Sequence, residues 1–362
     1  MASKPPKDQA YEIISPIRFH QSFKIPATDS HGPLKVSYAI AGKPLGGDVP
    51  TILFCAGMFG SRWLGVWLDH IAAKTGVQVL FIDRPGFGGS TVVSLSQRIA
   101  VFLETVPLLL QHLQISHINL VSHSSGTIFA LNLLAHYPDL LSPTNPSITL
   151  LAPWVHQSHS GVSFLKAASY VPNSLLNYWD SLTAFLINSS ALAASGGAIS
   201  SITSLFGKKK SIEEQERKCQ EGYGIPLVVK DELSKLGFKY LFAENTRGGN
   251  DEARLCLKSV EGECGWDACE DYVELVENLA KVWKARTEDG EKPKLKVKVL
   301  FAADDMMIGV KGRRYFQECW TQEKCGSGIE VECVVTEDTD HESLIDPAKG
   351  FVGQVFAMSL PA

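Results

Sequence analysis

The stretch LVSHSSGT, residues 120 to 127, carries the strongest local signal in this chain of 362 residues. The run 117–122 is typical of a buried strand, and the apolar pattern of residues 127–138 is typical of a helix. Between them, Ser124 lies in a turn with a small residue two positions away on each side, Ser122 and Gly126. The stretch therefore predicts a sharp strand-to-helix turn that presents a serine.

Strands and helices alternate on both sides of this turn. Strands are expected at 18–26, 34–42, 51–57, 77–83, 147–153, 295–303 and 329–335, and helices at 62–75, 96–113, 266–286, 312–320 and 347–359. From 51 to 153 and again from 295 onward the two kinds of element follow one another in turn. This order predicts βαβ units, and therefore a mostly parallel central sheet with helices on both faces.

The turn at 120–127 resembles the nucleophile elbow of the α/β-hydrolase fold superfamily, G-x-S-x-G, with Ser122 in place of the first glycine. In that family the nucleophile has a strained backbone, and large side chains two residues away would collide where strand meets helix. A nucleophile at Ser122 would place Leu120 at a flank, and one at Ser125 would place His123 and Thr127 there. The resemblance therefore implies Ser124 as the nucleophile.

A serine hydroxyl needs a base, and the base needs an acid that orients it. His341 is the one histidine beyond the last predicted strand, which is where the family has its base. Aligning LFAADD, 300–305, with the family's usual strand ending G-x-x-D places the acid at Asp305, with Asp304 as the alternative. The order Ser, Asp, His along the chain is that of this fold.

Two further motifs agree with the resemblance. CAGMFG, 55–60, is similar to the oxyanion-hole loop, usually H-G-x, which implies the backbone N–H groups of Met58 and Ser125 as oxyanion donors. IDRPGFGGS, 82–90, is similar to the D-x-x-G-x-G-x-S turn of the family, for which we expect a structural role.

The resemblance covers about 18–155 and 291–360. We therefore expect two parts of a hydrolase core, 1–154 and 291–362, separated by a mainly helical lid, 155–290. Apolar residues are frequent in the lid. The long, weakly polar stretch 184–206 contains six serines, which favours a soluble lid over a membrane span.

Bulk properties exclude several classes of function. With a formal charge of -5 and no long basic run, the chain offers no general attraction for nucleic acid. Its eight cysteines include no pair at zinc-ligand spacing, and neither a metal nor a cofactor is expected. The first residues lack the apolar run of a secretory signal, so a cytoplasmic location is predicted. Oligomeric state is left open by the sequence.

These features predict a serine hydrolase that cleaves an ester, thioester or related acyl bond of a small-to-medium, largely apolar substrate. Carbon–carbon bond hydrolysis and acyl transfer use the same three residues and remain alternatives. A non-catalytic ligand-binding protein of this fold is the alternative from another functional class. Serine at the elbow argues against epoxide hydrolysis and dehalogenation, which normally use a carboxylate nucleophile.

Overall fold

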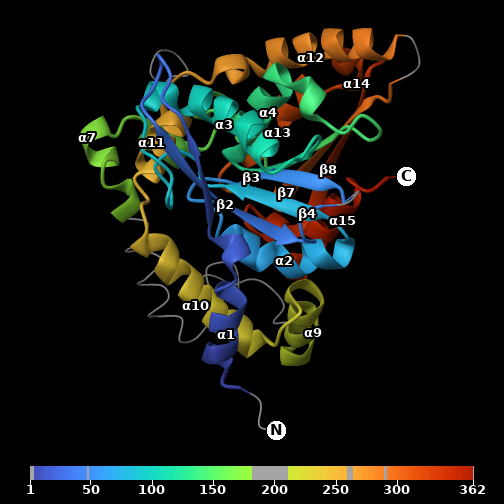
Figure 1. Cartoon of the computed structure of the whole chain (residues 1–362). Coiled ribbons are helices and arrows are strands. Elements are labelled where there is room, and N and C mark those ends of the chain that lie inside the picture. Colours follow the sequence, from blue (N-terminus) through green and yellow to red (C-terminus); the bar gives the residue numbers. More distant parts are fainter. Residues whose placement is uncertain (1–3, 47–48, 182–210, 259–263, 289–291, 362) are drawn as a thin grey trace.

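The computed structural model describes residues 4–46, 49–181, 211–258, 264–288 and 292–361. An eight-stranded sheet forms the centre of these residues (Figure 1). From one edge to the other its strands are β1 (Gln21–Ile25), β2 (Leu34–Gly42), β4 (Gln78–Ile82), β3 (Thr51–Cys55), β5 (Asn119–His123), β6 (Ser147–Leu151), β7 (Leu295–Asp304) and β8 (Ile329–Asp340). β2 is antiparallel to both of its neighbours, and all pairs from β4 to β8 are parallel. The predicted mostly parallel sheet is confirmed.

The four central strands are buried along their whole length. Their sequences TILFC, QVLFI, NLVSH and SITLL contain almost continuous apolar runs, and every residue in them is buried. A parallel strand covered by helices on both faces has no solvent side, so alternation of polar and apolar residues is not required. This is why the sequence pattern located these strands within a few residues.

Helices cover both faces of the sheet (Figure 1). On one face lie α2 (Leu64–Thr75) and α15 (Phe351–Ala357); on the other lie α3 (Arg98–His112), α4 (Gly126–His136), α12 (Tyr272–Thr287) and α13 (Gly309–Cys319). The buried side chains form one apolar cluster on each face. Phe129 of α4 and Phe316 of α13 belong to the first, and Leu68 of α2 and Phe356 of α15 belong to the second.

Between β6 and β7, the described secondary-structure elements are helices joined by loops. These helices are α5 (Gln157–Ser160), α6 (Ser163–Ser169), α7 (Asn173–Leu176), α9 (Ile212–Tyr223), α10 (Leu227–Ala243), α11 (Gly248–Leu257) and α12. α12 packs against α13, α14 (Gln322–Cys325) and β8, whereas α9 packs against α2, the turn Pro347–Lys349 and α10. The predicted domain boundaries stay predictions, and the stretch 184–206 lies outside the described residues.

The chain begins with a helix that the sequence analysis did not predict. α1 (Pro6–Ile14) precedes the first strand, buries Ala10 and Ile14, and packs along α10. Nine residues with only two buried positions leave little periodic signal. Contact with α10, more than 200 residues away in the chain, gives this short helix its apolar surroundings. None of the described helices is long and apolar enough to cross a membrane.

Helix α9 is held against the core by a glycine. A Cβ atom added at Gly222 would lie 2.5 Å from the backbone carbon of Pro347. Gly222→Ala should therefore force α9 away from the core and lower the free energy of unfolding by about 1–3 kcal/mol, as overpacking does. Urea unfolding measures this loss. Gly32→Ala is the matched control, because nothing lies within 4 Å of a Cβ at Gly32; equal losses in the two variants would contradict the close packing of α9.

Candidate active site

Ser124 occupies a strained backbone position between β5 and α4. Its φ angle is +51°, in the left-handed region that residues with a Cβ rarely adopt. A Cβ at Gly126 would lie 1.9 Å from the carbonyl oxygen of Cys55, so only glycine lets α4 begin this close to the end of β3. Ser122, at the other flank, is fully buried. Packing therefore requires glycine at position 126, and Ser122 leaves no exposed surface at the other flank.

Three side chains from distant parts of the chain form one hydrogen-bonded row. Ser124 Oγ lies 2.9 Å from His341 Nε2. His341 Nδ1 lies 2.9 and 3.0 Å from the two carboxylate oxygens of Asp305. Because an ionised carboxylate only accepts, Nδ1 carries the ring proton, and Nε2 of the neutral ring accepts from the serine hydroxyl.

The ends of β7 and β8 position the last two of these residues. Asp305 follows β7 directly and also accepts the backbone N–H groups of Met307 and Ile308, both at 2.9 Å. His341 follows β8, which pairs with β7. The neighbouring Asp304 is the last residue of β7 and is exposed. The structure therefore brings Asp305, the preferred candidate, to His341.

The environment favours the charged forms of both partners. Burial lowers the pKa of His341, but the hydrogen bond and the charge of Asp305 outweigh it, so the pKa of His341 is raised above 6.5. For Asp305, burial raises the pKa. The contact with His341 and the N–H groups of Ile308 and Met307 lower it by more, so the pKa of Asp305 is below its usual value. Asp305 is thus a carboxylate at neutral pH, ready to stabilise a protonated His341.

The loop after β3 runs beside Ser124, where the two predicted oxyanion donors also lie. A Cβ at Gly57 would be 3.1 Å from the Ser124 Cβ, which places the Gly57–Met58 peptide next to the serine. Ser125 is the N-cap of α4, and the N–H groups of a helix's first turn have no partners within the helix. Both predicted donors therefore come from backbone next to Ser124, and their role stays a prediction.

A second histidine at this site was not predicted from the sequence. His123 is buried, and its Nε2 donates to the backbone carbonyl of His341 at 2.9 Å. Burial lowers the pKa of His123, so its ring is neutral at physiological pH. His123, His341 and Glu342 offer donor atoms within 4.8 Å of one another, as a metal site would. Both nitrogens of His341 and one of His123 are already engaged, so this group is poorly suited to hold a metal.

Two buried arginines lie near the loop beside Ser124, and neither was predicted from the sequence. Arg84 donates to the carbonyl oxygens of Ala56 and Gly57 at 2.6 and 2.7 Å, and pairs with Glu252 of α11. Arg62 pairs with Asp83 at 2.8 Å and with Glu244, which follows α10. The one sequence signal for Arg84 is its place in the turn 82–90.

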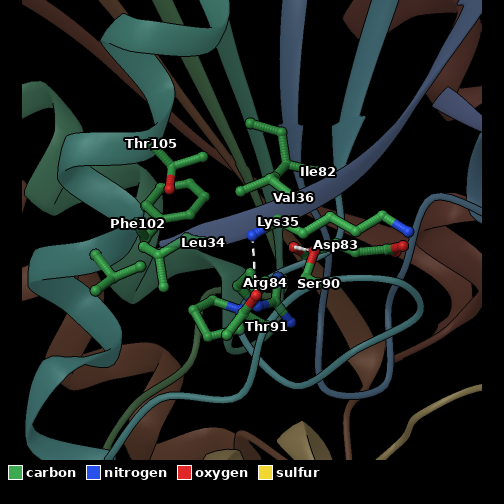
Figure 2. A pocket seen from close by; sticks show the side chains of 12 residues that line it. Leu34, Lys35, Val36, Ile82, Asp83, Arg84, Ser90, Thr91, Phe102 and Thr105 are labelled. Atoms are coloured by element: carbon green, nitrogen blue, oxygen red, sulfur yellow. Dashed lines mark hydrogen bonds between the residues drawn. The ribbon is translucent and has the colours of Figure 1, made fainter. Parts of the chain in front are cut away.

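A small cavity lies beside this turn (Figure 2). Its volume is about 10 Å³, roughly the space of one water molecule, and Asp83, Arg84 and Ser90 are among its lining residues. Ser90 Oγ donates to the Asp83 carbonyl at 2.7 Å, one of the bonds that hold the turn in shape. The cavity is too small for an organic substrate, and its lining agrees with a structural role for the turn.

Comparisons with known proteins concern the whole fold. Residues 50–196 match a family model described as the alpha/beta hydrolase fold. Similar solved structures include an epoxide hydrolase from Vigna radiata (TM-score 0.56, 15% identity, 94% of this chain and 98% of that chain covered). A thermophilic esterase from Thermogutta terrifontis has a TM-score of 0.52 at 14% identity, with 92% and 96% covered. An enol-lactonase from Burkholderia xenovorans LB400 has 0.51 at 15%, with 90% and 96% covered.

At these identities the structural likeness shows the fold alone, and the three proteins differ in the reactions that their names describe. Comparison with curated protein sequences gives no match. The reaction is therefore inferred from the side chains around Ser124.

The contact between Asp305 and His341 predicts a titration result. Asp305→Asn removes the charge that raises the pKa of His341 and leaves burial, which lowers it, so the pKa of His341 should fall. The measurement is a histidine NMR titration, with the His341 resonance assigned from a His341→Gln variant. Asp304→Asn is the matched control and should leave the pKa in place. A larger shift in Asp304→Asn than in Asp305→Asn would contradict the assignment.

Proposed function

Since residues 50–196 match the alpha/beta hydrolase fold model and the chain has this fold, we propose that it belongs to the α/β-hydrolase fold superfamily and is a serine hydrolase with Ser124, His341 and Asp305 as its catalytic triad. The observation that carries the proposal is the hydrogen-bonded row from Ser124 Oγ through the His341 ring to the Asp305 carboxylate, with distances of 2.9 to 3.0 Å. A nucleophile, its base and an orienting acid have this arrangement in serine hydrolases of unrelated folds.

The first half of the reaction forms an acyl-enzyme. His341 Nε2 takes the hydroxyl proton as Ser124 Oγ attacks the acyl carbon, and Asp305 holds the ring in the reactive tautomer while stabilising the imidazolium. The backbone N–H groups of Met58 and Ser125 donate to the oxyanion of the tetrahedral intermediate. When the intermediate collapses, the bond to the leaving group breaks, and the proton on His341 passes to the departing oxygen or sulfur.

The second half returns the enzyme to its starting state. His341 removes a proton from a water molecule, whose oxygen attacks the acyl carbon of the ester on Ser124. The intermediate expels Ser124 Oγ, which recovers the proton from His341, and the carboxylic acid leaves. Over the cycle one acyl bond and one water are consumed, and no oxidant, metal or cofactor is required.

The choice of an acyl bond is supported by the nucleophile itself. Epoxide hydrolases open their substrate through a carboxylate nucleophile, whereas this chain has Ser124 at the elbow. An alkyl-serine ether would resist hydrolysis, but an acyl-serine ester is hydrolysed readily. The likeness to the Vigna radiata epoxide hydrolase in overall structure therefore does not extend to its reaction.

The proposed substrate is a small-to-medium, largely apolar acyl compound. Large apolar side chains are exposed in the segment that contains α6 and α7: Phe164 (49%), Tyr170 (77%), Leu175 (60%) and Tyr178 (68%). Clustered exposed apolar side chains are typical of surfaces that bind apolar ligands or partners. This segment packs against α11, whose Glu252 binds Arg84 next to the oxyanion loop. A cytoplasmic location remains the companion prediction from the sequence.

A fluorophosphonate probe tests the nucleophile. It should label the wild-type protein at one residue, and Ser124→Ala should abolish labelling, because Ser124 Oγ lies 2.9 Å from a histidine that Asp305 orients as a base. Mass spectrometry identifies the labelled peptide. Ser122→Ala is the matched control, since Ser122 is also buried and its Oγ has no hydrogen-bond partner among the described residues. A folded wild-type protein that stays unlabelled would instead favour a non-catalytic binding protein.

Acyl chain length and pH test the substrate class and the base. With p-nitrophenyl esters and thioesters of increasing chain length, kcat/KM should rise by up to about fourfold per methylene until the site is filled. A kcat/KM that is flat from acetyl to decanoyl esters would argue against an apolar site.

At fixed substrate, kcat/KM should fall as pH drops through the raised pKa of His341, because the protonated ring cannot accept the serine proton. A midpoint below 6.5 would contradict the role of Asp305.

A further inference from the structure

Arg84 is a buried cation that the proposed reaction does not use. It follows β4, and its side chain is 2% exposed. Burial alone would lower the pKa of Arg84, but the charge and hydrogen bonds of Glu252 raise it, so the group remains a guanidinium. Burying a charge costs free energy unless partners compensate. Here the partners are one carboxylate and two consecutive backbone carbonyls, and the position of those carbonyls makes Arg84 relevant to catalysis.

The two carbonyls belong to the loop that supplies one proposed oxyanion donor. Arg84 Nη1 donates to Ala56 O at 2.6 Å, and Nη2 donates to Gly57 O at 2.7 Å. Gly57 O and the N–H of Met58 belong to the same planar peptide group, in which C=O and N–H point in opposite directions. With the guanidinium bound to the carbonyl oxygen, the Met58 N–H points away from Arg84, from the opposite edge of the peptide group.

Glu252 in turn fixes the orientation of the Arg84 guanidinium. Its carboxylate accepts Arg84 Nε at 2.5 Å and Nη2 at 2.8 Å, the two-point geometry that orients an arginine best. It also accepts Arg98 Nη2 at 3.0 Å, and both Glu252 and Arg98 are fully buried. Glu252 lies on α11, in the chain between β6 and β7, so this chain segment reaches the oxyanion loop through one buried ion pair.

We infer that Arg84, held by Glu252, is a positioning residue that fixes the Met58 N–H as an oxyanion donor. This inference rests on the proposed function. A donor held in place before the reaction stabilises the developing oxyanion without reorganising, and such fixed donors are among the largest contributions to acyl transfer. A cation on Gly57 O also polarises the peptide group, which makes its N–H a stronger donor.

A purely structural role for Arg84 makes a different prediction. The N–H of Gly60 also donates to Gly57 O, at 2.9 Å, so a tight turn restrains this peptide even without the arginine. If this turn were sufficient to orient the Met58 N–H, loss of the two Arg84 hydrogen bonds to the loop would lower stability and leave the chemical step unchanged. If Arg84 sets the donor, kcat must fall while substrate binding and the pKa of His341 stay as they are.

Arg84→Lys separates the two roles, because it keeps the positive charge near Glu252 and removes the planar fork. We expect kcat for a p-nitrophenyl ester to fall about 10- to 100-fold with KM nearly unchanged, below the loss for a deleted oxyanion donor. The affinity for a trifluoromethyl ketone, whose adduct with Ser124 carries an oxyanion, should fall by a similar factor. The pH midpoint of kcat/KM should not move, since Arg84 does not contact His341.

The matched control is Arg98→Lys. Arg98 shares Glu252 and is as buried as Arg84, but its other bond goes to Pro85 O rather than to the oxyanion loop. Arg98→Lys should lower the melting temperature and keep kcat within about twofold of wild type. A folded Arg84→Lys with wild-type kcat, or an equal loss of kcat in Arg98→Lys, would overturn the inference.

Two further measurements cover the remaining outcomes. If Arg84→Lys does not fold, Glu252→Gln provides the test, because glutamine keeps the shape of the side chain that binds Arg84. We expect a smaller but clear loss of kcat in this variant. A wild-type kcat would overturn the inference. The amide resonance of Met58, assigned by ¹⁵N-methionine labelling, should shift in both variants without any substrate present. A wild-type protein that neither hydrolyses esters nor reacts with the fluorophosphonate refutes the proposed function, and the Met58 resonance still reports on the peptide.

Discussion

The candidate site depends on one constraint, the left-handed backbone at Ser124 between β5 and α4. The turn is held from outside: Ser124 N–H donates to Leu151 O at 3.0 Å, and Ser124 O accepts the N–H of Trp154 at 3.2 Å. Both partners belong to β6 or to the chain that follows it. A strained conformation persists only when its surroundings over-determine it, and here the neighbouring strand and the packing of Gly126 on β3 do so.

The order of the strands then brings the other groups to this turn. β3 and β6 are the neighbours of β5, and β7 and β8 follow β6 in the sheet. Since these strands are parallel, their carboxyl ends lie along one edge, where ligands bind in open α/β sheets. The loop after β3, Asp305 after β7 and His341 after β8 all start from that edge. One sheet topology thus brings together Ser124, His341, Asp305 and the loop beside them.

Buried ion pairs connect the helices between β6 and β7 to the same region. Arg84 with Glu252, and Arg62 with Asp83 and Glu244, each join the core to α11 or to the end of α10. Replacing a buried pair with apolar residues is often harmless to stability, but removing one partner leaves an uncompensated charge and is costly. These buried ion pairs therefore matter mainly for the orientation of the groups around the site, because each fixes the direction of specific hydrogen-bond donors.

The sequence by itself determined the fold and the candidate nucleophile Ser124, because both leave local patterns: buried parallel strands are apolar runs, and the elbow needs small residues around Ser124. It preferred Asp305 to Asp304 only by alignment with a family pattern, and the helix α1 escaped it because nine residues carry too little periodicity. Only the tertiary structure decided which carboxylate reaches His341, and only it revealed the contacts of His123, Arg84 and Glu252. Arg84 and Glu252 are 168 positions apart, and a hydrogen bond across that separation depends on how the helices pack, which no local pattern of residues records.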